Sequence, residues 1–216
     1  MNVSKYICVI AAIALGACNS AKHENTSKDS IKAVADGPGK ILDEKYLVVA
    51  GKSIGQISVG DSLQKVNRIL GNADAGDAAM GKAWAIWYTK DPTTTQTSEY
   101  CIFSSYKDST MSSKDVKQIR ATSILFKTQD GFGVDRTFDD TKAKFGGLKK
   151  VSKYLNEKQD TITIYDDASL GIGFEFVRGR STAISVHQPN KPIQSDYLSP
   201  NPKWKKIELK PVIIQN

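Results

Sequence analysis

The chain has 216 residues and a formal net charge of +7, from 30 Lys and Arg residues against 23 Asp and Glu residues. This length accommodates one domain or two small ones. The lysines are scattered and form no basic run with interleaved aromatic residues. The composition therefore favours a solvated surface, and we predict no nucleic-acid partner.

The first seventeen residues predict an export signal. Lys5 precedes an uninterrupted apolar run over residues 6–15. Ten helical residues rise about 15 Å, half the roughly 30 Å of a hydrocarbon core, so the run is too short to span a bilayer and is typical of a signal peptide. The Leu-Gly-Ala-Cys sequence that ends at Cys18 resembles the lipobox of bacterial lipoprotein precursors. This resemblance implies cleavage of residues 1–17 and acylation of Cys18, by palmitate or a similar chain; the alternative is an ordinary secretory signal with a chance cysteine.

We expect an anchor made of lipid, because two or more acyl chains bind a bilayer stably without a transmembrane helix. Asn19 follows the cysteine, where aspartate is typical of lipoproteins kept in the inner membrane, so the sequence favours the outer membrane. A periplasmic and an outward-facing orientation are both compatible with it. Residues 18–40 are polar and close on Asp-Gly-Pro-Gly, which predicts a flexible tether.

Two segments, 57–71 and 132–147, repeat one another at a constant offset of 75 residues. Each predicts a short helix, with Ser62 or Thr137 as the N-cap and Gly71 or Gly146 at the end. An apolar stripe with i, i+3, i+7 spacing accompanies each helix: Leu63, Val66 and Leu70 in the first, and Phe138, Thr141 and Phe145 in the second.

Strand-like runs follow each predicted helix, at residues 82–90, 98–106 and 119–127 and then at residues 161–167, 171–177 and 181–187. Their alternating apolar residues predict antiparallel strands, with a tight turn at Gly179. The fold expected is α+β, with two tandem units that each consist of a short helix and an antiparallel sheet of three or more strands. The helices would cover one sheet face and leave the other available. We place the first unit at 41–128, with an insertion at 91–118, and the second at 129–216, with a further strand in the tail (204–214).

The segment from Ile57 to Gly71 reads hydrophobic-x-Val-Gly-x-Ser-Leu-x-x-Val-x-x-Ile-Leu-Gly. It is similar to the start of the repeat in β-lactamase-inhibitor-protein-like domains and in the small lipoprotein of the outer-membrane β-barrel assembly machinery. The run from Tyr165 to Val186 resembles the strands that follow in that group, whereas Asp135 stands in the second copy where the first has a glycine. The resemblance implies a helix-plus-sheet fold that binds other proteins, and it carries over no particular partner.

Few residues have the chemistry of a catalytic or metal site. Once the signal is removed and Cys18 is acylated, Cys101 is the one remaining cysteine, and its apolar neighbours favour a buried strand thiol over a reactive one. Cys101 with His187 is the one nucleophilic pair to consider, and nothing in the local sequence supports it. The pairs Asp139-Asp140 and Asp166-Asp167 fit a helix start and a strand turn, without the regular ligand spacing of a calcium loop. We predict no catalytic residue, no metal, no cofactor and no enzymatic activity.

Aromatic residues concentrate in the strands of the first unit, and aromatic side chains are enriched where proteins bind one another. The candidate partner-binding residues are Trp84, Trp87, Tyr88, Tyr100 and Tyr106. Core packing is the alternative explanation for them. The sequence favours an envelope lipoprotein that binds a protein partner without catalysis, inhibition of an enzyme included. The alternative is a structural or assembly lipoprotein of the outer membrane, or a binder of envelope glycan.

Overall fold

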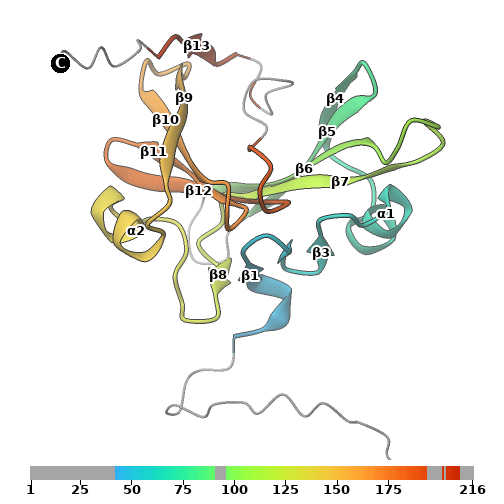
Figure 1. Cartoon of the computed structure of the whole chain (residues 1–216), viewed down its shortest axis with the longest axis horizontal. Coiled ribbons are helices and arrows are strands. Elements are labelled where there is room, and N and C mark those ends of the chain that lie inside the picture. The colour runs from blue at the N-terminus through green and yellow to red at the C-terminus, as the bar shows by residue number, and fades with distance from the viewer. Residues whose placement is uncertain (1–41, 91–95, 194–200, 202, 210–216) are drawn as a thin grey trace, which may run out of the picture. The chain divides into compact units, whose positions relative to one another are not determined.

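The computed structural model describes residues 42–90, 96–193, 201 and 203–209 (Figure 1). The predicted signal peptide, Cys18 and the tether lie outside the described residues. The chain from Lys40 onward forms one unit. Its fold is α+β, as predicted, and consists mostly of strands.

The described part of the chain contains two short α-helices, one 3-10 helix and thirteen strands. In chain order they are η1 (Glu44–Tyr46), β1 (Leu47–Val49), β2 (Ser53–Ile54), β3 (Ile57–Ser58), α1 (Leu63–Leu70), β4 (Ala75–Ala79), β5 (Lys82–Lys90), β6 (Thr97–Tyr106), β7 (Lys114–Ala121), β8 (Lys127–Thr128), α2 (Phe138–Lys144), β9 (Lys149–Leu155), β10 (Thr161–Asp167), β11 (Ile172–Val177), β12 (Arg180–His187) and β13 (Lys205–Ile207).

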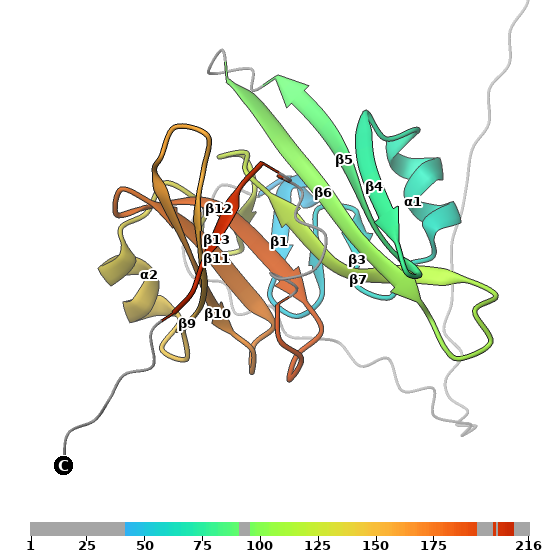
Figure 2. The ribbon, with the colours of Figure 1, turned by 90° about the horizontal axis from the view of Figure 1, so that it is seen from above.

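Nine strands form one antiparallel sheet in the order β13-β9-β10-β11-β12-β7-β6-β5-β4. α1 is followed by β4 to β7 and α2 by β9 to β12, and each set is a run of four neighbouring strands. β7 and β12 pair with each other, with Arg120 opposite Ser185, and so join the two sets (Figure 2). The prediction of two separate tandem units is therefore wrong, because backbone pairing makes the sheet continuous. Each helix precedes four strands, which agrees with the predicted three or more.

A smaller mixed sheet has the order β3-β2-β1-β8, in which β1 and β8 are parallel. The sequence predicts none of these strands, because two or three residues are too few to establish alternation. In Figure 1 the small sheet and both α-helices lie on the same side of the nine-stranded sheet.

The main core lies between the nine-stranded sheet and this layer of helices and short strands. It includes Val66 of α1, Phe145 at the end of α2, Ile54 of β2, and Ile119 and Val186 on the paired strands β7 and β12. Residues from both halves of the chain therefore bury one another in a single core.

The opposite sheet face is also largely buried, contrary to the expectation that it would be open. One apolar cluster there covers β5 and β6, and another covers β9 and β10; their buried members are Trp84, Ile86, Cys101 and Phe103, and Tyr154, Ile162, Ile164 and Ile193. We call this side the outer face.

Both helices begin where the sequence predicts. The Ser62 Oγ accepts a hydrogen bond from the Lys65 N–H (3.2 Å), and the Thr137 Oγ1 accepts one from the Asp140 N–H (3.1 Å). α1 is capped at its end by Gly71 with φ +74°, as predicted. The predicted end of α2 at Gly146 is wrong by one residue, since Phe145 caps the helix and packs its ring into the core.

The strand predictions are mostly confirmed. β5 and β10 have the predicted bounds, β6, β11 and β12 begin within one residue of the prediction, and Gly179 has φ +81° in the turn before β12. The predicted strand at 119–127 is wrong in position, because β7 ends at Ala121 and the chain then carries Phe126 into the inner layer. The predicted insertion at 91–118 instead contains β6 and the start of β7, and the described part of the tail strand is β13 alone.

Candidate functional site

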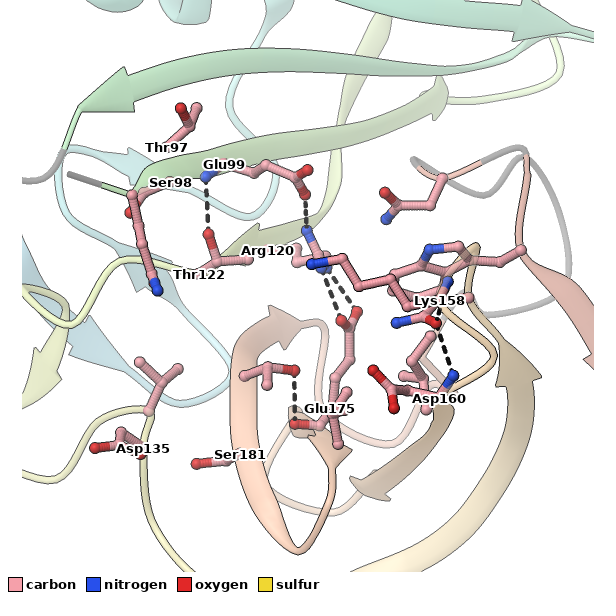
Figure 3. Close-up of a pocket in the computed structure, with 18 of the residues that line it drawn as sticks. Thr97, Ser98, Glu99, Arg120, Thr122, Asp135, Lys158, Asp160, Glu175 and Ser181 are labelled. Carbon is pink, nitrogen blue, oxygen red and sulfur yellow. Dashed lines mark hydrogen bonds and ion pairs between the residues drawn. The ribbon is translucent and has the colours of Figure 1, made fainter. Parts of the chain in front are cut away.

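A groove opens on the outer face where β7 ends at Ala121 while its neighbours β6 and β12 continue beyond that point. Its volume is about 770 Å³, within the range of roughly 300–1,000 Å³ that is usual for ligand sites. The polar and aromatic residues that line it include Ser98, Glu99, Arg120, Thr122, Asn156, Lys158, Asp160, Glu175, Ser181 and Trp204 (Figure 3).

Arg120 lies at the floor of the groove, held between two carboxylates. Its Nε and Nη2 donate to the two carboxylate oxygens of Glu175 at 2.6 and 2.7 Å, and its Nη1 donates to the Glu99 Oε2 at 2.6 Å (Figure 3). The side chains of Arg120 and Glu175 are 5% and 8% exposed, whereas that of Glu99 is 24% exposed. The contact follows from strand register, because Arg120, Glu99 and Glu175 all lie on the outer face of neighbouring or nearly neighbouring strands.

The guanidinium stays charged in this setting. Burial by itself lowers the pKa of Arg120, but Glu175, Cys101 and Glu99 together raise it more, and the net result is a pKa well above the ordinary value. Two carboxylates then share one cation, so the Glu99–Arg120–Glu175 triad has one negative charge in excess when both glutamates are ionised.

The rim of the groove adds further carboxylates. Asp160 accepts a hydrogen bond from the Arg178 Nε at 2.9 Å, Glu157 pairs with Lys203 at 2.7 Å, and Asp135 pairs with Arg180. The lining itself has five carboxylates against two cations, Arg120 and Lys158. Three of these five carboxylates are thus paired with basic side chains outside the lining, and the excess negative charge of the groove lies in the Glu99–Arg120–Glu175 triad.

One wall of the groove is the turn between β9 and β10, which is fixed by its own hydrogen bonds. The Asn156 Oδ1 accepts from the Lys158 N–H at 2.9 Å and from the Asp160 N–H at 2.8 Å. Trp204 stands beside this wall, its ring 6.1 Å from that of Tyr154. These contacts give the groove a preorganised edge with one aromatic surface.

None of the five predicted aromatic residues lines this groove. Trp84, Trp87 and Tyr100 are buried, with exposed fractions of 3%, 8% and 8%, and Tyr88 and Tyr106 are 46% and 38% exposed. Tyr88 of β5 lies opposite Glu99 of β6, and Glu99 is seven residues, or about 23 Å, from Tyr106 along β6. The two exposed tyrosines therefore lie far apart. The structure does bring Trp87, Tyr88 and Tyr100 together, around a separate cavity between α1, β5 and the small sheet.

Cys101 and His187 each have a different partner. Burial raises the pKa of the Cys101 thiol to about 11, with Arg120, 3.7 Å from the sulfur, opposing the rise. His187 is buried, and its Nε2 lies 2.8 Å from the Asp166 Oδ1. Asp166 also accepts from the Ile193 N–H at 3.2 Å, so this pair ties the chain after β12 to β10. Because its pKa is raised, the Cys101 thiol is a poor nucleophile near neutral pH.

The acidic pairs have structural partners as well. Asp139 and Asp140 lie in the first turn of α2, and Asp167 accepts from the Gly147 N–H at 3.1 Å and from the Ser169 hydroxyl at 2.6 Å. Within the described residues, no three His, Cys, Asp or Glu side chains are grouped so that they could hold a metal ion.

Sequence reasoning misses the triad of Glu99, Arg120 and Glu175. Each is a lone charged residue in an apolar strand, and that signal by itself predicts a solvent-facing side chain. Their contact depends on the β6–β7 hairpin and on the pairing of β7 with β12, a strand far from it in the sequence.

No family model, curated protein or solved structure matches this chain. The resemblance to inhibitor-protein-like domains therefore stays an expectation drawn from the Ile57–Gly71 motif. Neither α1 nor α2, the α-helices of the described residues, has the length and apolar character that crossing a bilayer requires.

Proposed function

We propose that this protein is an envelope lipoprotein, anchored through lipid on Cys18 to the outer membrane, and that it binds a segment of a protein partner without catalysis. The observation that carries the proposal is the groove on the outer face, with its volume of about 770 Å³ and with two carboxylates that share the single cation of Arg120 at its floor. A preformed polar groove of this size suits an extended segment or a protruding loop.

The charge of the groove indicates the chemistry of the partner. The Glu99–Arg120–Glu175 triad has excess negative charge, and the Glu99 side chain is partly exposed to the groove. A lysine or arginine side chain that enters the groove would compensate this charge, and opposite charges across an interface set register and speed association. The partner segment in this proposal is basic. If the partner is an enzyme, this protein would inhibit it by binding that segment.

Capture by photocrosslinking in the native envelope tests this proposal. We compare the wild type with Glu99→Gln/Glu157→Gln, which lowers the negative charge of the groove while leaving the Arg120–Glu175 pair intact. The matched control is Glu44→Gln/Glu208→Gln, which removes two exposed carboxylates outside the groove.

We expect a partner that is crosslinked by the wild type and by the control, and lost with the groove variant and at high salt. Equal capture by all three proteins would remove the groove from the proposal. If no protein is captured by any of them, protein binding is rejected.

A second candidate function is binding of envelope glycan, and one specific observation favours it. Trp204 offers a flat ring beside Asn156 and the carboxylate of Asp160, a combination that can stack on a sugar ring and bond its hydroxyls. Trp204→Ala would then abolish retention on peptidoglycan. Glu99→Gln/Glu157→Gln would retain it, which distinguishes this function from protein binding. A role in outer-membrane assembly would use the groove with a β-barrel protein as partner.

A further inference from the structure

Two exposed methionines lie at the ends of neighbouring hairpins. Met80 lies in the turn between β4 and β5 and is 90% exposed, and Met111 lies in the loop between β6 and β7 and is 65% exposed. The hairpins adjoin because β5 pairs with β6, with Lys82 opposite Ser105, and Figure 1 and Figure 2 both show their ends side by side. Neither methionine lines the acidic groove of the outer face, so this end of the sheet is a separate surface.

Tyr106, the last residue of β6, connects the two ends. Its ring lies so close to the β4–β5 turn that a Cβ atom on Gly81 would be 2.6 Å from it, and the tyrosine side chain is 38% exposed. Lys114 lies opposite Tyr106 where the β6–β7 loop begins. We call Met80, Tyr106 and Met111 the methionine tip. Exposed apolar side chains that gather at one place are typical of a surface that contacts something outside the chain.

Both methionines have a backbone conformation that methionine rarely adopts. The φ angle is +49° at Met80 and +55° at Met111, in the left-handed region where a Cβ atom crowds the backbone and where glycine and asparagine are common. Hairpin turns such as Met80-Gly81 favour Asn-Gly. Neither methionine offsets this strain by burial, because both side chains are exposed. The local structure therefore favours another residue at both positions, which indicates that the methionines serve a contact outside the chain.

Lysines surround the methionine tip. Lys107 is exposed, the Lys114 Nζ lies 5.1 Å from the centroid of the tyrosine ring of the tip, and neither forms an ion pair within the described residues. Of the two aspartates in the same stretch, Asp115 pairs with Lys117, and Asp108 accepts a hydrogen bond from a backbone N–H of its own loop at 2.9 Å. Residues 80–82 and 105–117 together contain four lysines and two aspartates, a net charge of +2. The apolar tip is therefore set among positive charges.

A bilayer surface supplies both kinds of partner that the methionine tip needs. Apolar side chains enter the boundary of the acyl chains, a tyrosine ring suits the level of the headgroups, and lysines attract anionic lipids. A protein partner is the alternative, but a stable protein interface buries about 800 Å² on each side, more than three side chains on two turns provide.

From the exposed methionines, their disfavoured backbone and the surrounding lysines, we infer that the methionine tip inserts into the surface of an anionic bilayer. This contact goes beyond the proposed function, on which it rests only for a membrane near the domain. It does not depend on the partner of the acidic groove.

The experiment is nuclear magnetic resonance of the methionine methyl groups, with the full chain purified from bacterial membranes and held in lipid nanodiscs. The discs contain about 30% phosphatidylglycerol or phosphatidylcholine alone, and a spin-labelled headgroup broadens the signal of any methyl group near the surface. Met80→Asn and Met111→Asn assign the two signals. Because asparagine is favoured where φ is positive, both variants should melt at or above the wild-type temperature, which separates a contact role from a structural one.

We expect both methyl signals of the wild type to fall about five-fold in the anionic discs and less than about two-fold in the neutral discs. Lys107→Gln/Lys114→Gln should restore most of the intensity, whereas Lys90→Gln/Lys153→Gln, which removes the same charge away from the tip, should not. Signals of full intensity in the anionic discs, or equal restoration by the two lysine variants, would overturn the inference. Mass spectrometry of Cys18 tests the proposed anchor separately, so the anchor and the tip can fail independently.

Discussion

Arg120 shows how one side chain can determine the charge of the groove floor. Its guanidinium is 5% exposed and satisfies Glu175 through two hydrogen bonds. Removing one partner of a buried ion pair leaves the other charge uncompensated, which costs more than the pair contributes. We expect Arg120→Met to lower the free energy of unfolding by about 3–5 kcal/mol in urea titrations.

Two further variants separate charge burial from loss of packing at this site. Arg120→Met/Glu175→Met should recover most of the lost stability, because both buried charges are then replaced by apolar groups. Arg178→Met removes a rim arginine that is 77% exposed, and we expect a change of about 0.5 kcal/mol or less. If the double variant is no more stable than Arg120→Met, the pair is not the cause of the loss.

Cys101 predicts a dependence of stability on alkaline pH. Burial raises the pKa of its thiol from an ordinary 9.0 to about 11. Below pH 9 the thiol is neutral in both states, and between pH 9 and pH 11 the unfolded chain loses the proton first, so the free energy of unfolding falls. Between pH 8 and pH 11 the wild type should lose about 1–2 kcal/mol more than Cys101→Ala, since two pKa units correspond to at most about 2.7 kcal/mol. Parallel pH profiles for the two proteins would contradict this.

At the scale of elements, α1 is a short helix whose start depends on one hydroxyl. The Ser62 Oγ accepts a hydrogen bond from the Lys65 N–H at 3.2 Å. We expect Ser62→Ala to lower the free energy of unfolding by about 1 kcal/mol and Ser62→Asp to preserve it, measured by urea unfolding. Equal losses in the two variants would show that the hydroxyl does not act as a cap.

Elements with a strong local signal could be predicted from the sequence, and those that depend on distant partners could not. β5 contains a run of apolar residues, in β10 apolar and polar residues alternate, and Ser62 and Gly71 are residue types typical of the N-cap and C-cap that they form on α1. β4 contains only Ala, Gly and Asp, and it forms because it pairs with β5. The two strands approach so closely that a Cβ atom on Gly76 would lie 2.5 Å from the Trp84 carbonyl oxygen, which leaves room only for glycine. The apolar run after Ala121 continues the strand pattern in the sequence. In the structure the chain leaves the nine-stranded sheet there, and Phe126 packs against Tyr100.

The acidic groove was beyond sequence reasoning for the same physical reason. Its floor joins β6, β7 and β11, and only the pairing of β7 with β12 brings Arg120 to Glu175. The five aromatic residues stay a prediction as a binding site: three of them line one cavity, none lines the acidic groove, and Trp84, Trp87 and Tyr100 are buried.

At the scale of the whole described unit, the β7–β12 pairing has a thermodynamic consequence. The main core includes Val66 and Phe145, one from each half of the chain, and the paired strands run between them. Because neither half can expose its side of this core without exposing the other, we expect one cooperative unfolding transition.

Single-region tryptophan variants test this cooperativity. Trp204→Phe leaves Trp84 and Trp87 to report on β5, and Trp84→Phe/Trp87→Phe leaves Trp204 to report on the side of β9. For each variant the urea midpoint by fluorescence should equal its midpoint by far-ultraviolet circular dichroism. Two separated midpoints in either protein would mean that the halves unfold independently.

β4 is one of the two edge strands of the nine-stranded sheet, and no strand of the described residues pairs with its free side. An edge strand with small side chains is a template for strand addition by a second molecule, and anchorage to a membrane would raise the local concentration of such molecules. Asp77 stands at the centre of the five residues of β4. Antiparallel pairing of two copies about that centre sets the two Asp77 carboxylates opposite each other, where like charges repel. We therefore expect the single acidic residue in β4 to oppose edge-to-edge self-association.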